Sequence, residues 1–207
     1  GRTEATGFGC VDVMRAFIDI KGKTVSIQGF GNVGAHAALG LAREGAIVQY
    51  INDHTMALYR EEGFSVIELE AMVNWVNTRP RGQALIDYYS GGKINAQPKG
   101  EFVRSDWKIG LDERTREVLG AKVDVLILAA LESQIRKDNV DIINAKIIVE
   151  GANGPTTRAA ERELYKRGVS VIHDTLANAG GVIVSSLETE QAVLGEWYSA
   201  EEVGARR

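Results

Sequence analysis

The chain has 207 residues, of which 44% are hydrophobic and 25% charged, and its formal net charge is −4. This composition fits one large α/β domain, whereas the acidic balance excludes the basic stripe of a nucleic-acid-binding surface. The single cysteine, Cys10, excludes an internal disulfide and favours a reducing, cytoplasmic compartment, and no apolar run approaches the ~20 residues that cross a membrane. Because the sequence starts at Gly1 without a methionine, we expect a piece of a longer protein or a processed chain.

Apolar residues recur at helical and strand spacings along the chain, and β-branched runs alternate with amphipathic segments. This alternation predicts an α/β fold with a doubly wound, mostly parallel sheet of the Rossmann type. The stretch 77–110, rich in glycine and proline, gives no clear pattern. The expected elements are helices over 4–18, 33–43, 65–76, 85–89, 112–119 and 157–167, strands over 24–28, 47–52, 123–128, 147–150 and 169–172, and one long final helix from 176 through 193.

A glycine loop, G-F-G-N-V-G, joins the first expected strand to the second expected helix. Gly29 permits the tight turn, Gly31 lets the backbone approach a pyrophosphate, and Gly34 allows the helix to pack closely on the strand. The free N–H groups at the helix N-terminus would bind the pyrophosphate, since the helix dipole favours negative charge there. The loop therefore predicts a dinucleotide site.

Asp53 ends the next expected strand, about 20 residues beyond the loop, where a carboxylate binds the ribose hydroxyls of NAD. Such a carboxylate repels a 2′-phosphate, so NAD is favoured over NADP, although a protonated His54 would soften that preference. The alternative is that the glycines form only a tight turn and that Asp53 caps a helix.

Five segments, in this order, resemble the Glu/Leu/Phe/Val dehydrogenase family, and the resemblance is greatest to members that act on glutamate. Together they cover most of the chain and are highly specific, although no single one would be. The segments are GRTEATG (1–7), GFGNVG (29–34), DVLILAALE (124–132), VEGANGPTT (149–157) and LANAGGVIVS (176–185).

The resemblance implies an NAD-dependent enzyme, with NADP possible, that reversibly deaminates L-glutamate to 2-oxoglutarate and ammonia by hydride transfer. It implies a dinucleotide-binding domain over 1–207, with 191–207 as the start of a C-terminal helical region, and a substrate domain outside this chain. The parent would be a homo-oligomer, a hexamer by resemblance. The alternatives are a dehydrogenase for an apolar amino acid and a non-catalytic nucleotide-binding regulatory subunit.

The roles of family residues can be carried over by position. On this basis the resemblance implies that Asn32 and the backbone of Gly31 and Val33 contact the cofactor phosphates. It also implies that Thr6 binds the carboxamide group of the nicotinamide. A hydroxyl or amide orients that neutral group through directional hydrogen bonds without adding charge beside the reacting carbon.

Three further residues are assigned in the same way. Asn153 and Asn178 would line the nicotinamide side of the cleft, and Ser185 would bind the distal carboxylate of a glutamate-like substrate. The residues alone leave alternatives: Asn153 as a turn residue, Asn178 as a helix N-cap, and Ser185 as a helical serine that bonds back to the preceding turn.

No catalytic acid–base pair is expected in this chain. The resemblance places the family's catalytic lysine and aspartate in the missing substrate domain, and we interpret Lys93, after Gly91-Gly92, as a solvated loop lysine. Cys10 is expected in the core, and the three histidines, His36, His54 and His173, share no spacing typical of a metal site.

Overall fold

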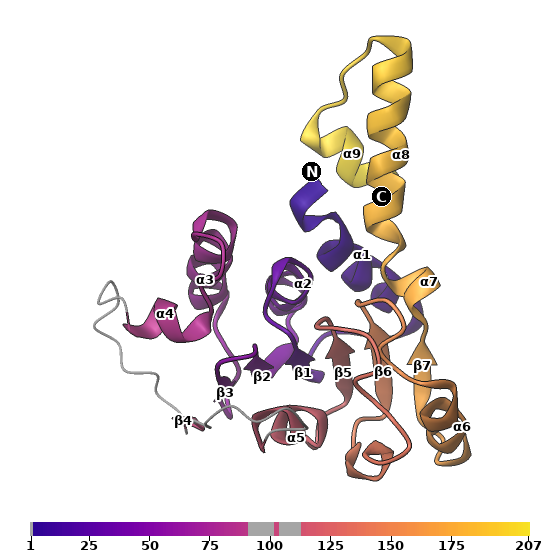
Figure 1. Ribbon diagram of the computed structural model, residues 1–207. Helices are drawn as coiled ribbons and strands as arrows, with labels where there is room; N and C mark the ends of the chain where they lie inside the picture. The colour runs from indigo at the N-terminus through magenta and orange to yellow at the C-terminus, as the bar shows by residue number, and fades with distance from the viewer. Residues whose placement is uncertain (1, 91–101, 104–112) are drawn as a thin grey trace.

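The computed structural model describes residues 2–90, 102–103 and 113–207. Its sheet has seven strands in the order β4-β3-β2-β1-β5-β6-β7 (Figure 1). The strands from β2 to β7 in that order are mutually parallel, whereas β3 and β4 extend one edge in antiparallel orientation. The strands are β1 (Thr24–Gln28), β2 (Ile47–Asn52), β3 (Ala57–Tyr59), β4 (Phe102–Val103), β5 (Val125–Leu128), β6 (Ile147–Glu150) and β7 (Ser170–Ile172).

Helices cover both faces of the sheet, with α1, α2 and α3 on one side and α5 and α6 on the other (Figure 1). This arrangement confirms the predicted doubly wound fold. The helices are α1 (Arg2–Phe17), α2 (Asn32–Arg43), α3 (Val66–Thr78), α4 (Leu85–Ser90), α5 (Glu113–Leu119), the 3₁₀ turn η1 (Val140–Ile142), α6 (Arg158–Lys166), α7 (Asp174–Ala177), α8 (Ala179–Leu194) and α9 (Ala200–Arg206).

Alternate side chains of the central strands enter two separate cores, one on each face of the sheet. On β5, Val125 and Ile127 pack into the core under α1, α2 and α3, whereas Leu126 and Leu128 pack into the core under α5 and α6. A strand that is buried on both faces has no polar positions to alternate with, which explains its continuous apolar run.

The structure adds short elements that were not expected, among them the 3₁₀ turn η1, and divides one that was. The short antiparallel strands β3 and β4 were not predicted. The predicted single helix from residue 176 is two helices, because Asn178 has φ −99° and ψ 6° and separates α7 from α8. Lys93 and much of the stretch 77–110 lie outside the described residues.

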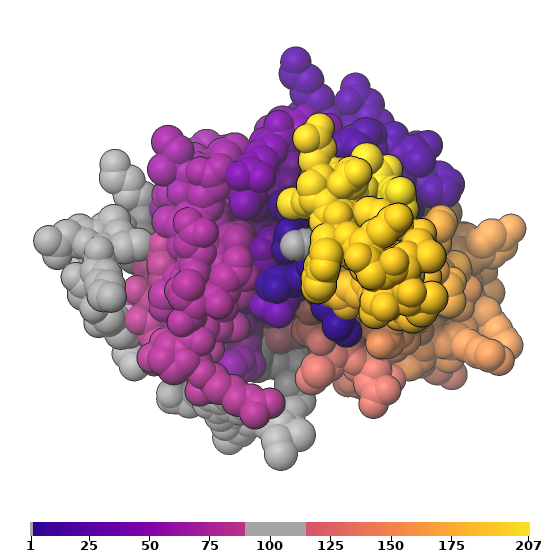
Figure 2. Space-filling model, turned by 90° about the horizontal axis from the view of Figure 1, so that it is seen from above, coloured from indigo at the N-terminus to yellow at the C-terminus, as the bar shows by residue number. Residues whose placement is uncertain are grey.

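The first and last long helices pack against each other at glycines. A Cβ built on Gly9 would lie 3.0 Å from the Cα of Gly180, and one on Gly180 would overlap the carbonyl oxygen of Ala5. Figure 1 shows α1 beside α8, and Figure 2 shows the C-terminal helices lying over the N-terminal segment. None of the described helices is long and apolar enough to cross a membrane.

Candidate functional site

The glycine loop has the geometry that its sequence predicts. Gly29 has φ +94°, and its N–H donates to both the backbone and the side-chain oxygen of the buried Asn52, at 3.1 and 3.0 Å. A Cβ on Gly34 would overlap the carbonyl oxygen of Gly29. Both glycines are therefore required by the protein's own packing.

Gly31 is different, because a Cβ built on it would meet no atom of the described chain within 4 Å. It is the N-cap of α2, with φ −91°, and its turn carries no side-chain cap and no acidic residue. Asn32, the first residue of the helix, is exposed beside these open N–H groups. The space over Gly31 and the helix end without a side-chain cap are features that suit an anion, because the free N–H groups at a helix N-terminus favour negative charge.

Asp53 lies at the end of β2, as predicted, and its carboxylate accepts four hydrogen bonds from the chain itself. Oδ1 accepts from the backbone N–H and hydroxyl of Thr55, at 2.7 and 2.6 Å, and from the N–H of Met56 at 3.2 Å. Oδ2 accepts from the N–H of Leu85 at 2.6 Å, at the start of α4. Asp53 thus organises the loop after β2 and caps α4, and its lone pairs leave room for a ligand hydroxyl as well.

A cavity of about 660 Å³ lies on the other side of the loop. It brings together Thr6 from α1, Asn153 after β6 and Asn178 between α7 and α8. The side-chain amide of Asn178 donates to the side-chain oxygen of Asn153 at 2.8 Å. The polar residues that the family resemblance assigns to the nicotinamide therefore line one wall, although the residues are far apart in the sequence.

Two carboxylates hold this wall in place. Glu150, 3% exposed at the end of β6, accepts from the N–H of Asp174 at 3.1 Å, and Asp174 accepts from the N–H of Gly154 at 2.8 Å. His173, at the N-cap position of α7, has its Nδ1 3.5 Å from the same Glu150 oxygen. These contacts tie the loop that carries Asn153 to the helix that leads into Asn178.

Ser185 lies on α8 one turn beyond Gly181, which lines the same cavity, so the two share a helix face. Among the described residues its hydroxyl has no hydrogen-bond partner, whereas its carbonyl accepts from the hydroxyl of Thr189 at 3.1 Å. The back-bonding serine considered for this position is therefore not what the structure shows. Its hydroxyl remains available to a ligand.

A second cavity of about 460 Å³ lies over Gly29 and Gly31 and includes Asp53 and His54. Ala129, Ala130 and Leu131, after β5, line both cavities, so the two are neighbouring parts of one cleft across the glycine loop. This cleft lies at the carboxyl ends of the parallel strands, where open α/β sheets bind ligands.

Two polar residues of the second cavity were not singled out by the sequence. Within the described chain, Nη1 of Arg79 and Oε1 of Gln28 are buried without a hydrogen-bond partner. Gln28 uses its amide nitrogen to donate to Gln134 at 2.5 Å. The only signal for Gln28 was its place as the last residue before the loop, and Arg79 had none.

Other candidates are structural. Cys10 is fully buried, which confirms that it is a core residue, and this burial raises the pKa of its thiol from 9.0 to about 12. His36 is buried and bonds through Nδ1 to the carbonyl oxygen of Asn32 at 2.7 Å. The described residues contain no cluster of three or more potential metal ligands.

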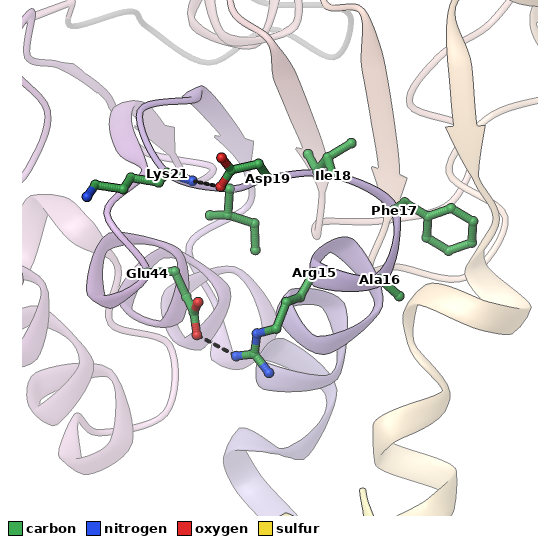
Figure 3. Close-up of a pocket in the computed structure, with 8 residues that line it drawn as sticks. Arg15, Ala16, Phe17, Ile18, Asp19, Lys21 and Glu44 are labelled. Carbon is green, nitrogen blue, oxygen red and sulfur yellow. Dashed lines mark hydrogen bonds and ion pairs between the residues drawn. The ribbon is translucent and has the colours of Figure 1, made fainter.

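A further hollow lies at the opposite end of the sheet, before β1 (Figure 3). Its charged side chains are already engaged: Arg15 pairs with Glu44, and the Asp19 carboxylate accepts from the N–H of Lys21 at 3.1 Å. It lies at the amino ends of the strands and plays no part in the cleft.

Comparison with known proteins agrees with this geometry. The sequence model of the Glutamate/Leucine/Phenylalanine/Valine dehydrogenase family matches residues 1–206. A glutamate dehydrogenase of Aeropyrum pernix is 38% identical over 97% of this chain and 43% of its own length, and an NADP-specific glutamate dehydrogenase of Synechocystis is 36% identical over 100% and 46%.

Among solved structures, the hetero-hexameric glutamate dehydrogenase of Thermus thermophilus superposes with a TM-score of 0.76 at 30% identity, covering 100% of this chain and 44% of its own. The chain thus spans less than half the length of these three relatives. With the family sequence model matched over 1–206, the chain belongs to the Glutamate/Leucine/Phenylalanine/Valine dehydrogenase family.

Proposed function

We propose that this chain is the cofactor-binding half of an NAD(P)-dependent glutamate dehydrogenase, which reversibly deaminates L-glutamate to 2-oxoglutarate and ammonia. The observation that carries the proposal is the cleft across the glycine loop. One of its cavities lies over Gly29 and Gly31, the other contains Thr6, Asn153 and Asn178, and the uncapped end of α2 lies at the loop that both adjoin.

The residues of the cleft fit the parts of a dinucleotide. The N–H groups at the start of α2 would bind the pyrophosphate, with Asn32 beside them. The adenosine would lie toward Asp53, and the nicotinamide would lie against the wall formed by Thr6, Asn153 and Asn178. When bound, the nicotinamide ring supplies the hydride acceptor for oxidation at the amino acid Cα.

The task of this wall is orientation. Thr6 and Asn178 offer a hydroxyl and an amide that can hold the carboxamide and so fix which face of the ring is presented. The Asn153–Asn178 hydrogen bond pre-organises that contact. Gly181 keeps the space open, because a Cβ there would overlap the Thr6 hydroxyl.

Substrate binding and acid–base chemistry are proposed to depend on the rest of the parent protein. Ser185, beyond the nicotinamide wall, would bind the distal carboxylate of glutamate, and the lysine and aspartate of the family mechanism would come from a separate substrate domain. We place the parent in the cytoplasm and expect a homo-oligomer, a hexamer by resemblance to the family.

Two measurements test the proposal. Fluorescence titration and calorimetry should give micromolar-range binding of NAD(H) or NADP(H) by this chain, while it should turn over no glutamate. The variant to compare is Gly31→Ala, in which a methyl group would occupy the space over the loop, and it should lose dinucleotide binding. Steady oxidation of glutamate by this chain alone would contradict the two-domain proposal, and a wild-type chain that binds neither cofactor would contradict the cofactor site.

For the whole enzyme, Ser185→Ala should raise the KM for glutamate more than the KM for leucine or valine. A parent that prefers an apolar amino acid, and that is indifferent to this substitution, would contradict the glutamate assignment.

A further inference from the structure

The imidazole ring of His173 lies between two carboxylates that belong to different elements. Its Nδ1 is 3.5 Å from Oε2 of Glu150, at the end of β6, and its Nε2 is 3.4 Å from Oε1 of Glu161, on α6. Figure 1 shows β6, β7, α6 and α7 on one side of the molecule, where β6 contacts both β7 and α7. One half-exposed side chain after β7 therefore connects β6 with α6 through their carboxylates.

Only the protonated ring offers a donor to each carboxylate. A neutral imidazole carries one N–H, and its other nitrogen is an acceptor, so a neutral ring would direct a lone pair at one of the two carboxylates. Among the described residues, His173 is the only basic side chain within ion-pair distance of Glu150 or Glu161. Asp174, next in the chain, and Tyr165, which lines the same surface hollow as Glu161, also lie near the ring, and neither is a cation. The contact is therefore complete only when His173 carries its second proton.

The same contact is continuous with the nicotinamide wall. The Glu150 oxygen that faces His173 also accepts the N–H of Asp174 at 3.1 Å. The Asp174 carboxylate accepts in turn, at 2.8 Å, the N–H of the residue that follows Asn153. Asp174 is also the first residue of α7, which is four residues long and ends at Asn178. The groups around this one buried oxygen therefore set the relative position of both asparagines of the wall.

From these contacts, and resting on the proposed cofactor site, we propose that His173 is a positioning residue for the nicotinamide wall and that its protonation tightens the wall. The charged ring holds Glu150 beside α7 and joins it to α6, whereas the neutral ring keeps only one of the two contacts. Histidine changes its charge near neutral pH. The proton and the nicotinamide then favour each other's binding, so the affinity for NADH falls as the pH rises.

The test compares NADH with ADP-ribose, which lacks the nicotinamide ring, by calorimetry on the 207-residue chain between about pH 6 and about pH 8. His36 and His54 lie toward the pyrophosphate and the adenosine, so their effects act on both ligands and cancel in the ratio of the two dissociation constants. In the wild type, the preference for NADH over ADP-ribose should fall about threefold across this range, as expected of a partly exposed charged contact. In His173→Gln, which keeps a donor but has no charge, the preference should be independent of pH and equal to the wild-type value at the upper limit.

Two glutamates of α6 provide matched variants. Glu161→Gln should reduce the pH dependence, because the ring then faces one carboxylate instead of two. Glu163→Gln is the control: its carboxylate pairs with Lys166, so the pH dependence should stay that of the wild type. The thermal unfolding midpoint of each variant checks that it folds. A purely structural role for His173 would instead weaken NADH binding in His173→Gln by the same factor at every pH.

Amide hydrogen exchange of the ligand-free chain gives a second readout. The amides of Asp174 and Gly154 close the link between Glu150 and the wall, so their protection factors should fall as the pH rises in the wild type and stay constant in His173→Gln. A wild-type preference for NADH that does not change with pH, or that changes equally in His173→Gln, would overturn the proposal. If the chain binds neither ligand, the proposed cofactor site is wrong, and protection factors independent of pH would then overturn the role of His173 as well.

Discussion

Asn178 donates a hydrogen bond of 2.8 Å to Asn153, which lies 25 positions earlier in the chain. The bond joins the loop after β6 to the break between α7 and α8, and both residues line the larger cavity. This pair, rather than either residue alone, forms the part of the cavity where we propose that the nicotinamide binds.

Asn178→Ala should weaken NADH binding about three- to tenfold, because one neutral hydrogen bond contributes about 0.5–1.5 kcal/mol. Binding of 5′-AMP, which occupies only the adenosine end, should not change. Asn144→Ala is the control: its amide bonds to Gly120, away from the cleft, so it should affect stability and not affinity. Equal weakening of both ligands by Asn178→Ala would show that the wall is not specific to the nicotinamide.

Substitution by alanine should affect stability at one glycine of the loop and dinucleotide binding at another. Gly34→Ala should lower the free energy of unfolding by about 2 kcal/mol or more, because its Cβ would overlap the Gly29 carbonyl oxygen. Gly31→Ala should leave stability within about 0.5 kcal/mol of the wild type and still abolish dinucleotide binding. Urea denaturation and NADH titration of both variants measure this, and a Gly31→Ala chain that binds normally would remove the pyrophosphate from this loop.

Asp53→Ala should lower the free energy of unfolding by about 2 kcal/mol or more, since four donors would lose their acceptor. Asp141→Ala, at an exposed aspartate in η1, is the matched control and should cost less than about 0.5 kcal/mol. Urea denaturation of both variants and the wild type measures these changes in the free energy of unfolding. An Asp53→Ala chain as stable as the wild type, but with weakened NAD binding, would favour ribose binding over loop organisation as the main role of Asp53.

Stability should fall above pH 9 because of Cys10. The unfolded thiol releases its proton near pH 9.0, whereas burial raises the folded pKa to about 12, so the folded state holds the extra proton in between. The free energy of unfolding should therefore decrease as pH rises through this window, by up to about 1.4 kcal/mol per pH unit.

Cys10→Ala should remove that contribution. Tyr89, whose pKa burial also raises to about 12, contributes equally in both proteins and cancels in the comparison. Denaturation curves between pH 8 and pH 11 test this. Identical slopes for the two proteins, or rapid alkylation of folded wild type at pH 8, would show that the thiol is accessible.

The parallel core and its helices could be predicted from sequence because burial on both faces leaves long apolar runs and helical spacings. The strand β3 could not be predicted, since Ala57–Tyr59 is only three residues long and reaches β2 through the turn that Asp53 organises. The break at Asn178 lies two residues before Gly180, which packs closely against Ala5, a contact between distant segments that no local pattern reveals.

The candidate site divides in the same way. The glycine loop and Asp53 were predicted from spacing, whereas the positions of Thr6, Asn153 and Asn178 came only through the resemblance. Neither the spacing nor the resemblance pointed to Arg79, because an arginine at a helix end is ordinarily a surface residue. Its significance comes from the buried Nη1 and the neighbouring cavity.

The contact between α1 and α8 also orders events during synthesis. Arg2 pairs with Glu188, 186 positions away, so α1 leaves the ribosome long before the helix that completes its surroundings. The cavity over Gly29 and Gly31 is lined by residues no later than Gln134, whereas the cavity that contains Thr6 is also lined by Asn178 and Gly181. The latter cavity can therefore be completed only after α8 has left the ribosome, near the end of synthesis of this segment.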